Sequence, residues 1–367
     1  MKRILIVEDD PAISKALCDA LNVAGYDTRC IEDGLEGLNT AKAMKPDLLL
    51  LDVMLPSMNG FEICTALRVN GYTFPVFMLT SLTEEARRMQ GLETGADEYI
   101  SKPFSIKELL LRIKNTLNRE EKLRERSAEL ENEIAKAREI QLKSLPGKAP
   151  DVPGLEIYGT MIPAETVGGD YYDYIQLSEG RTGIIIADVC GKGLAAAMLV
   201  QKLQGVVCSF TGAGVKAGEM AKIISERMKD GLPKGGFITF AIAVYDPGNH
   251  SVELVRAGHL PFLFSGKEGV KEIKPAGLWL GPMPSKAFGD NIVVENITIN
   301  KNDLLIMITD GVTECVNEGG EEYGLERLKP LLTSFGSVAE RILNELNTFR
   351  GSVNLKDDTT LIVIKGT

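Results

Sequence analysis

The stretch EEKLRERSAELENEIAKAREIQLKSL, residues 120–145, separates two parts of the chain that differ in character. It belongs to a run from Ile106 to Leu145 that holds neither Pro nor Gly and is rich in Glu, Lys, Arg, Leu and Ala. Residues of these types favour helix at nearly every position. The run therefore predicts one long helix, which the sequence Leu145-Pro146-Gly147 brings to an end.

One side of this helix carries residues at alternating four- and three-residue spacings, which is the spacing of a coiled-coil seam. The seam consists of Leu123, Ser127, Leu130, Ile134, Ala137 and Gln141. Because the seam is short and includes Ser and Gln, we interpret residues 106–146 as a weak, switchable coiled-coil linker that pairs two copies of the chain in a parallel homodimer. The alternative is a single solvated helix that only joins two domains.

The bulk composition sets limits on the class of protein. A chain of 367 residues predicts two domains and a linker. The formal net charge of −10 and the lack of a long basic cluster argue against a nucleic-acid partner. Six scattered cysteines without a CxxC pair argue against a disulfide framework or a zinc site. The opening MKRILIVEDD is unlike a signal peptide, and apolar runs are too short to span a membrane, so we expect a cytoplasmic protein without a membrane partner.

Residues 1–118 alternate short apolar strand candidates with helical segments. The strand candidates are Arg3–Val7, Thr28–Ile31, Asp47–Leu51, Val76–Leu79 and Glu98–Ile100. The helical segments are Pro11–Ala24, Leu35–Met44, Phe61–Val69, Glu84–Thr94 and the start of the long helix. This alternation predicts an α/β domain with a doubly wound, parallel, five-stranded sheet, whose ligands bind at the carboxyl ends of the strands.

Polar side chains follow the predicted strands at those ends. They are Glu8, Asp9 and Asp10 after the first strand, Asp52 after LLLL, Thr80 after the fourth strand and Lys102 after the fifth. Carboxylates that converge on one point repel each other and need a cation, and oxygen ligands suit Mg²⁺. A carboxylate beside Mg²⁺ and a lysine can accept a phosphoryl group, because the positive charges neutralise the oxygens being transferred.

The motifs VEDD, LLLLDVMLPSMNG, LTS and ADEYISKPF, in this order, resemble those of the receiver domain of bacterial response regulators. The resemblance implies that a sensor histidine kinase phosphorylates Asp52 and that Lys102-Pro103 is a cis peptide. The implied Mg²⁺ ligands are Asp52, Asp9, Asp10 and the backbone carbonyl of Met54. The implied phosphate contacts are Thr80 and Lys102, and Tyr99 is the implied aromatic switch residue.

Residues 150–367 are richer in Gly and Pro, and short β-rich segments dominate them. The strand candidates are Leu155–Met161, Gly183–Ala187, Phe237–Tyr245, Val252–Arg256, Phe262–Phe264, Ile292–Ile299, Leu304–Ile308 and Thr360–Ile364. The helix candidates are Ala195–Thr211, Ala217–Lys229 and Val338–Phe349. Strands in runs, with helices in groups, predict an α+β sandwich and not a second doubly wound sheet.

Acidic residues again stand at strand ends, each beside a glycine or a turn. They are Asp170, Asp188, Asp310 and the pair Asp357-Asp358. Taken singly, an Asp-Gly pair such as Asp310-Gly311 is typical of a turn. Together, carboxylates without paired His or Cys favour Mg²⁺ or Mn²⁺ over Zn²⁺. Two such ions can clamp a phosphate ester and activate a water for in-line attack.

The motifs VGGDYYDY, IADVCGKG, RAGHLPF, ITDGVTE and KDDTTLIVI resemble the PPM-type metal-dependent serine/threonine phosphatases, in their RsbU-like bacterial branch. The resemblance implies that Asp188 bridges two Mn²⁺ or Mg²⁺ ions, with the backbone carbonyl of Val189 as a further ligand. It also implies that Asp310 and Asp357 hold the first ion and that Asp170 completes the second site through water. Asp358 and Asp173 are alternatives for these roles.

Other residues of this segment are less informative. Cys190 stands where the eukaryotic members have a proposed histidine acid, which leaves the proton donor to the leaving serine open. His259 is at least as readily explained as a structural histidine as a catalytic one. We expect His250 to be exposed in a turn and Trp279 to pack in the core.

These features together predict a response regulator in which phosphorylation of Asp52 controls a phosphatase for phosphoserine or phosphothreonine. The resemblance implies a phosphorylated anti-sigma-factor antagonist as the substrate. One alternative is a module that binds a regulatory protein without hydrolysing it. A DNA-binding response regulator is disfavoured by the charge and by the lack of a helix-turn-helix candidate.

Overall fold

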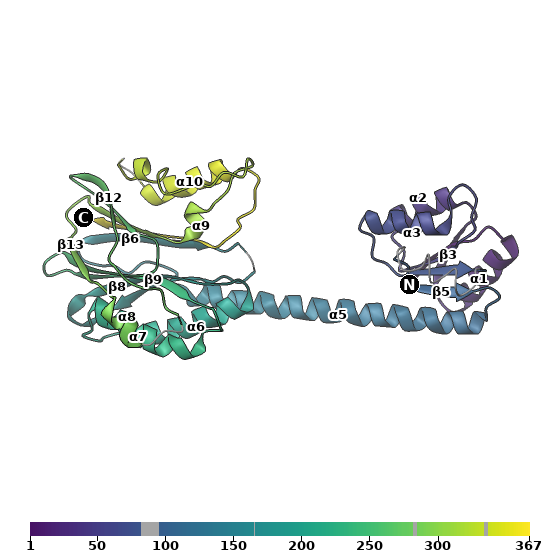
Figure 1. Ribbon diagram of the computed structural model, residues 1–367, viewed down its shortest axis with the longest axis horizontal. Helices are drawn as coiled ribbons and strands as arrows, with labels where there is room; N and C mark the ends of the chain where they lie inside the picture. Colours follow the sequence, from purple (N-terminus) through teal and green to yellow (C-terminus); the bar gives the residue numbers. More distant parts are fainter. Residues whose placement is uncertain (82–94, 165, 282–284, 334–336) are drawn as a thin grey trace. The chain divides into compact units, whose positions relative to one another are not determined.

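The computed structural model describes residues 1–81, 95–164, 166–281, 285–333 and 337–367 (Figure 1). The chain divides into two compact units, Met1–Leu130 and Glu131–Thr367. The division falls inside helix α5, Ile106–Ser144, which is the long helix predicted from the sequence. Each unit is described separately.

The first unit is a doubly wound α/β domain, as predicted. Its parallel strands have the order β2-β1-β3-β4-β5. The strands are β1 Arg3–Val7, β2 Asp27–Ile31, β3 Leu48–Asp52, β4 Val76–Thr80 and β5 Glu98–Ser101. The described helices are α1 Pro11–Val23, α2 Gly34–Met44, α3 Gly60–Val69 and the first part of α5. The predicted helix Glu84–Thr94 lies outside the described residues.

The central strands of this unit are buried on both faces, which explains the uninterrupted LLLL run. Leu49 and Leu51 belong to one apolar cluster, whereas Leu48 and Leu50 belong to the other. This alternation follows from the two-residue period of a strand. Helices therefore cover both faces of the sheet, and the polar side chains that can bind a ligand lie at the ends of the strands.

Helix α5 changes its surroundings along its length. Leu109, Ile113 and Leu117, spaced four apart, pack against the sheet of the first unit. The seam residues Leu123 and Leu130 are 56 % and 54 % exposed. Gln141, in contrast, is only 4 % exposed and contacts residues of the second unit. The expectation that Gln141 belongs to an intermolecular seam was therefore wrong, because the fold of the same chain already covers it.

The second unit is a sandwich of two antiparallel sheets, as predicted. The sheets have the orders β13-β10-β9-β8-β7 and β12-β11-β14-β15-β6. The strands are β6 Leu155–Ile162, β7 Asp170–Gln176, β8 Thr182–Val189, β9 Ile238–Asp246, β10 Ser251–Ala257, β11 Phe262–Gly266, β12 Gly269–Ile273, β13 Glu295–Thr298, β14 Leu304–Ile308 and β15 Thr359–Gly366. Besides the end of α5, the described α-helices are α6 Leu194–Cys208, α7 Ala217–Met228, α8 Ser285–Asp290, α9 Asp310–Thr313 and α10 Val338–Arg350.

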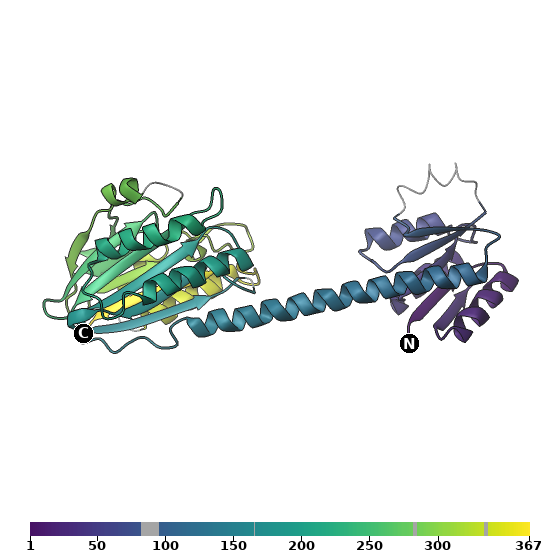
Figure 2. The same cartoon turned by 90° about the horizontal axis from the view of Figure 1, so that it is seen from below.

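The layers of the second unit follow from its apolar clusters. Helices α6 and α7 cover the outer face of one sheet, and α10 covers the outer face of the other (Figures 1 and 2). Ile184 and Ile186 point between the sheets, whereas Ile185 faces the helices. One apolar core thus lies between the two sheets, and each sheet has a further apolar core between its outer face and the helices that cover it.

The sequence analysis missed strands β7 and β12 and the short helices α8 and α9. Strand β7 reads DYYDYIQ, and its acidic residues at positions 170 and 173 looked like parts of a turn. Its tyrosines nevertheless alternate, with Tyr171 in the helix-side cluster and Tyr172 between the sheets.

Among the described residues, the helices are too short or too polar to cross a membrane.

Candidate functional sites

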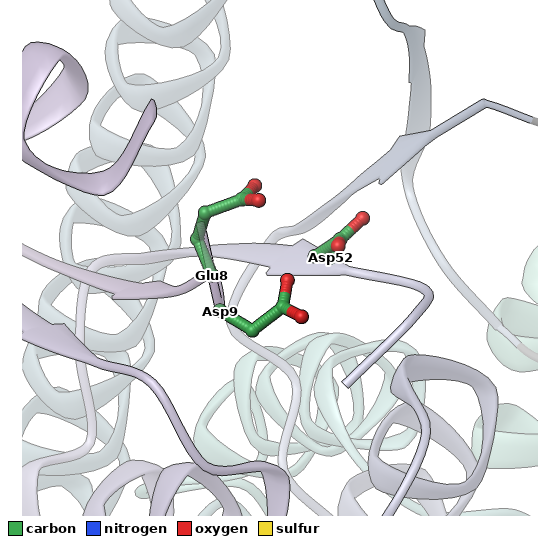
Figure 3. A group of neighbouring side chains, drawn as sticks. All are labelled: Glu8, Asp9 and Asp52. Atoms are coloured by element: carbon green, nitrogen blue, oxygen red, sulfur yellow. The ribbon is translucent and has the colours of Figure 1, made fainter. Parts of the chain in front are cut away.

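Three carboxylates meet at the carboxyl ends of strands β1 and β3 in the first unit. Glu8, Asp9 and Asp52 each place an oxygen within 4.8 Å of the other two (Figure 3). Glu8 is fully buried and Asp52 is 5 % exposed, whereas Asp9 faces solvent. Oxygen ligands at a partly open edge, with room for water, fit Mg²⁺. The strand ends therefore bring together the acids that the sequence placed there.

The identity of one acid in this cluster differs from the prediction. The Oδ1 atom of Asp10 accepts hydrogen bonds from the backbone N–H groups of Ala12 and Ile13, at 2.8 and 3.2 Å. Asp10 is thus the N-cap of helix α1, and Glu8 takes its place beside Asp9 and Asp52. In VEDD, the first two acids turn toward the sheet edge, while the third satisfies the free N–H groups of the helix.

Lys102 supplies the positive charge in this site. Its Nζ lies 2.7 Å from both Oε atoms of Glu8 and 3.2 Å from Oδ1 of Asp52. Burial raises the pKa of Glu8 and of Asp52, and Lys102 opposes both shifts. Burial alone lowers the pKa of Lys102, but the hydrogen bond to Glu8 and the charge of Asp52 outweigh it and raise that pKa. The lysine is therefore held as a cation between two carboxylates.

The remaining residues predicted for this site lie close to it. Thr80 ends strand β4 and is 1 % exposed, and its carbonyl accepts the backbone N–H of Lys102 at 2.8 Å. Tyr99 lies on β5 and is partly buried against the apolar cluster of that face. Met54 follows the end of β3, and its side chain is 71 % exposed. The peptide bond Lys102-Pro103 is cis, as predicted.

The acids of the second unit lie around the ends of four strands. Asp170 is the first residue of β7 and pairs in register with Asp188 near the end of β8. Asp310 begins helix α9 directly after β14, and Asp357 precedes β15. Asp188, Asp310 and Asp357 line one pocket of 380 Å³. Asp170 is not among the residues that line this pocket, and it is only 2 % exposed.

The pocket has a strong excess of negative charge. Burial and then the charges of Asp310, Asp357, Asp358 and Glu314 raise the pKa of Asp188 to about 7. Burial and Asp357 raise the pKa of Asp310 as well. Lys192, whose Nζ is 3.2 Å from Oδ2 of Asp357, compensates part of this charge. Carboxylates that repel one another in this way fit divalent cations.

The acids of the pocket are more widely spaced than those of the first unit. Within the described ranges, Glu8, Asp9 and Asp52 alone place three ligand atoms within 4.8 Å of one another. Ligands for a single ion converge on one point, whereas ligands for a pair of ions are spread over a larger region. The wider spacing around Asp188 is therefore compatible with two ions.

Asp170 is fixed by two hydroxyl groups. Its Oδ2 accepts hydrogen bonds from Oγ1 of Thr309 at 2.7 Å and from Oγ1 of Thr360 at 2.5 Å. Burial and the charge of Asp188 raise the pKa of Asp170 well above its ordinary value, and the two threonines oppose that rise. Two donors on one oxygen fix the orientation of the carboxylate.

The two alternative acids each have other hydrogen-bond partners. Asp358 accepts backbone N–H bonds from Ala164 at 2.9 Å, Gly169 at 2.7 Å and Asp170 at 3.4 Å, so it anchors the loop before β7. Asp173 accepts the hydroxyl of Tyr171 at 2.8 Å, on the helix-side face of β7. The structure therefore does not bring Asp173 together with Asp188.

Sequence reasoning missed Glu314, Lys192, Thr309 and Thr360. Glu314 lies one helical turn after Asp310, and its backbone N–H donates to the Asp310 carbonyl at 2.7 Å. A four-residue spacing from a predicted ligand was the available signal for this residue. Gly311, between them, has no space for a side chain, since a Cβ would lie 1.9 Å from the carbonyl oxygen of Asp358.

The two histidines and Trp279 differ in their burial. His259 is 5 % exposed, and its Nδ1 lies 2.8 Å from Oγ1 of Thr239. Burial lowers the pKa of His259 to about 4, so the ring is neutral near pH 7, as expected for a structural histidine. His250 is exposed, as predicted. The prediction of a core Trp279 was wrong, because the side chain is 51 % exposed beside Phe237, which lines the pocket.

We expect His259→Gln to reduce the acid sensitivity of the second unit. The native pKa of about 4 lies below the ordinary value of 6.5, so wild type loses up to about 3 kcal/mol of stability as pH falls between these values. The loss is absent above pH 6.5 because the ring is then neutral in both states. The measurement is the difference in unfolding free energy between wild type and variant from pH 7.5 to 4.5. A difference that does not change with pH would contradict the assignment.

Comparison with known families covers both units. Residues 178–366, slightly more than half of the chain, match the family described as stage II sporulation protein E (SpoIIE). Residues 4–114 match the response regulator receiver domain. The SiaA-PP2C domain of Pseudomonas aeruginosa is 18 % identical with a TM-score of 0.54, over 66 % of this chain and 98 % of that chain. That likeness shows the PP2C fold of the second unit.

Curated relatives match the first unit. The DNA-binding dual master transcriptional regulator RpaA of Synechocystis sp. (strain ATCC 27184 / PCC 6803 / Kazusa) is 43 % identical over 125 residues, which are 34 % of this chain and 52 % of RpaA. The alkaline phosphatase synthesis transcriptional regulatory protein PhoP of Bacillus subtilis (strain 168) is 42 % identical over 147 residues, 40 % of this chain and 61 % of PhoP. The chain thus spans about half the length of the curated relatives it matches.

Proposed function

The chain belongs to the SpoIIE family and carries a receiver domain, and from this premise we propose that it is a response regulator whose output is a metal-dependent protein phosphatase. The observation that carries the proposal is the pocket of Asp188, Asp310 and Asp357, with its excess of negative charge. The proposed domains are the receiver (residues 1–118), the helical linker (106–146) and the phosphatase (150–367). The cytoplasmic location predicted from the sequence stays part of the proposal.

Asp52 is the proposed phospho-acceptor. Its Oδ1 accepts the backbone N–H of Val53 at 2.8 Å and contacts Lys102, which favours Oδ2 as the attacking atom. Asp9, Asp52 and the backbone carbonyl of Met54 are the proposed ligands of Mg²⁺, with Glu8 in place of Asp10. Thr80 and Lys102 are the proposed contacts of the new phosphoryl group, and Tyr99 is the proposed switch residue. A sensor histidine kinase is the proposed donor.

In the phosphatase domain, Asp188, Asp310, Asp357 and the Val189 carbonyl are the proposed ligands of two Mn²⁺ or Mg²⁺ ions. Such ions supply charge neutralisation for a phosphate ester and a nucleophilic water at neutral pH. Asp170, held by Thr309 and Thr360, is the fourth proposed catalytic acid and keeps the second ion's side of the site in place. Cys190 lines the same pocket and is exposed.

The proposed substrate is a phosphoserine or phosphothreonine protein. The resemblance of the sequence to the RsbU-like branch supports a phosphorylated anti-sigma-factor antagonist. An open pocket of 380 Å³ that includes exposed Phe237 accommodates a phosphorylated side chain presented by a protein surface. The alternative, binding without hydrolysis, makes a different prediction for turnover.

A direct assay tests the proposal. The full chain is incubated with Mn²⁺ or Mg²⁺ and either p-nitrophenyl phosphate or a phosphoserine protein, with and without acetyl phosphate as a donor for the receiver. Metal-dependent release of phosphate that changes with the donor is the expected result. Tight binding of the phosphoprotein without release of phosphate would replace the proposal with the binding module.

We expect Leu130→Asp to weaken a homodimer formed through the linker. Leu123 and Leu130 are more than half exposed on α5, and a charge at the second position would oppose burial of that seam. Sedimentation equilibrium should show at least about a tenfold increase in the dimer dissociation constant, which corresponds to 1.4 kcal/mol. Glu129→Asp, at the exposed neighbouring position, is the control. Equal association of wild type and Leu130→Asp would exclude this seam.

A further inference from the structure

The side chain of Gln141 is bound to the loop that carries Asp170. Its Nε2 donates to the carbonyl of Gly168 at 2.7 Å, and its Oε1 accepts the backbone N–H of the same residue at 3.0 Å. Gln141 is 4 % exposed, although it lies on a helix whose composition is strongly polar. One amide thus satisfies both backbone groups of one residue in a buried place.

These two hydrogen bonds require a side-chain amide at position 141, because one needs a donor and the other an acceptor. A carboxylate at position 141 would accept the N–H group but repel the Gly168 carbonyl, and an apolar side chain would leave both backbone groups without these partners. Position 168 is equally restricted, since a Cβ there would lie 2.3 Å from Oδ2 of Asp358. The loop is therefore enclosed between the Gln141 amide and the Asp358 carboxylate.

The loop leads directly to the proposed metal site. Gly169 donates its N–H to Asp358 at 2.7 Å and accepts the N–H of Val189 at 3.0 Å. The next residue, Asp170, pairs in register with Asp188. Gln141 is thus connected through two peptide units to one acid of the site, and through the Val189 backbone to another.

The end of helix α5 that carries Gln141 is itself seated in the phosphatase unit. The Ser144 carbonyl accepts a hydrogen bond from Nε2 of Gln204 on α6, and the Pro146 carbonyl accepts the hydroxyl of Tyr172 at 3.3 Å. Ile140, one position before Gln141, is 63 % exposed. Neighbouring positions on a helix differ by about 100° in direction. The bonds at Ser144 and Pro146 therefore hold the helix end in the orientation that points Gln141 at Gly168.

We propose that Gln141 is a positioning residue for the metal site, and that its bonds to Gly168 set the affinity of the phosphatase unit for divalent cations. The proposal rests on the proposed function. On this proposal, a movement of the last turns of α5 would alter the metal site through the contact between Gln141 and Gly168. Partners that hydrogen-bond metal ligands directly typically change metal affinity about 10- to 100-fold when removed, and Gln141 acts on the acids through the Gly168–Asp170 backbone, so we expect an effect at the lower end of that range.

The test is a Mn²⁺ titration of the full chain, in which electron paramagnetic resonance measures the concentration of free Mn²⁺. All proteins carry Asp9→Asn, which removes a proposed ligand of the receiver site. The variants are Gln141→Glu, which keeps the size but repels the Gly168 carbonyl, and Gln141→Met, which keeps the packing without either bond. Gln176→Glu, the same change at an exposed position of this unit, is the control.

We expect both Gln141 variants to bind Mn²⁺ at least about tenfold more weakly than the control, with kcat for p-nitrophenyl phosphate recovering at high Mn²⁺. Two variants guard against one that fails to fold, and circular dichroism identifies such a variant. Unchanged Mn²⁺ affinity in a folded Gln141 variant, with binding and turnover intact in the Asp9→Asn parent protein, would overturn this inference alone. If the Asp9→Asn parent protein neither binds Mn²⁺ nor hydrolyses the ester, the proposed function fails as well.

Discussion

Asp188→Asn is expected to reduce metal-dependent hydrolysis of p-nitrophenyl phosphate by at least about 100-fold, with little loss of folded protein. The substitution keeps the shape of the side chain and removes one negative charge from the centre of the acidic pocket. Without metal it relieves repulsion from Asp310 and Asp357, so the unfolding temperature should hold or rise. Adding Mn²⁺ should raise that temperature in wild type more than in the variant.

The matched control is Asp173→Asn, on strand β7. Asp173 is bonded to Tyr171 on the helix-side face, whereas Asp188 faces the pocket. We expect kcat/KM of this variant within about threefold of wild type, because its carboxylate is not part of the proposed metal site. Full activity of Asp188→Asn, or equal losses in both variants, would contradict the assignment of Asp188.

Asp52→Asn is expected to remove the response of the phosphatase to a phosphodonor. The amide of asparagine lacks the nucleophilic oxygen needed to form an acyl phosphate, and it places no negative charge beside Lys102. Activity with and without acetyl phosphate should then be equal within error, whereas wild type should show a ratio different from one. Gel separation of phosphorylated and unphosphorylated chains measures the modification directly.

Asp19→Asn, at an exposed position of helix α1, is the control for Asp52→Asn and should keep the wild-type ratio. Phosphorylation that persists in Asp52→Asn would mean that another residue is the acceptor. A lost modification with a retained activity ratio would mean that the donor acts on the phosphatase unit without the receiver.

Much of the fold could be predicted because local patterns and the tertiary structure agree. The run LLLL predicted a strand buried on both faces, and the structure places Leu48–Leu51 between two apolar clusters. Helix α5 was predicted to within one residue at its end, because nearly every residue of the run favours helix and Pro146 follows it. Strand β7 was missed because its acids looked like turn residues, although its buried tyrosines follow the period of a strand.

The site was less predictable than the fold. The positions of acids at predicted strand ends placed Asp52 at the edge of the parallel sheet, and the structure brings Asp188, Asp310 and Asp357 to one pocket. The sequence did not indicate which acid of VEDD caps helix α1, since all three precede Pro11. It also gave no sign that Thr309 and Thr360 bind Asp170, which lies more than 100 positions away in the chain.

Strand β15 has a consequence for synthesis of the protein. It lies between β14 and β6 inside its sheet, and it or the two residues before it supply Asp357, Asp358 and Thr360. A nascent chain that has emerged only through α10 has a complete receiver but lacks this strand and these acids. On the proposed function, such a chain can be phosphorylated before it can release phosphate.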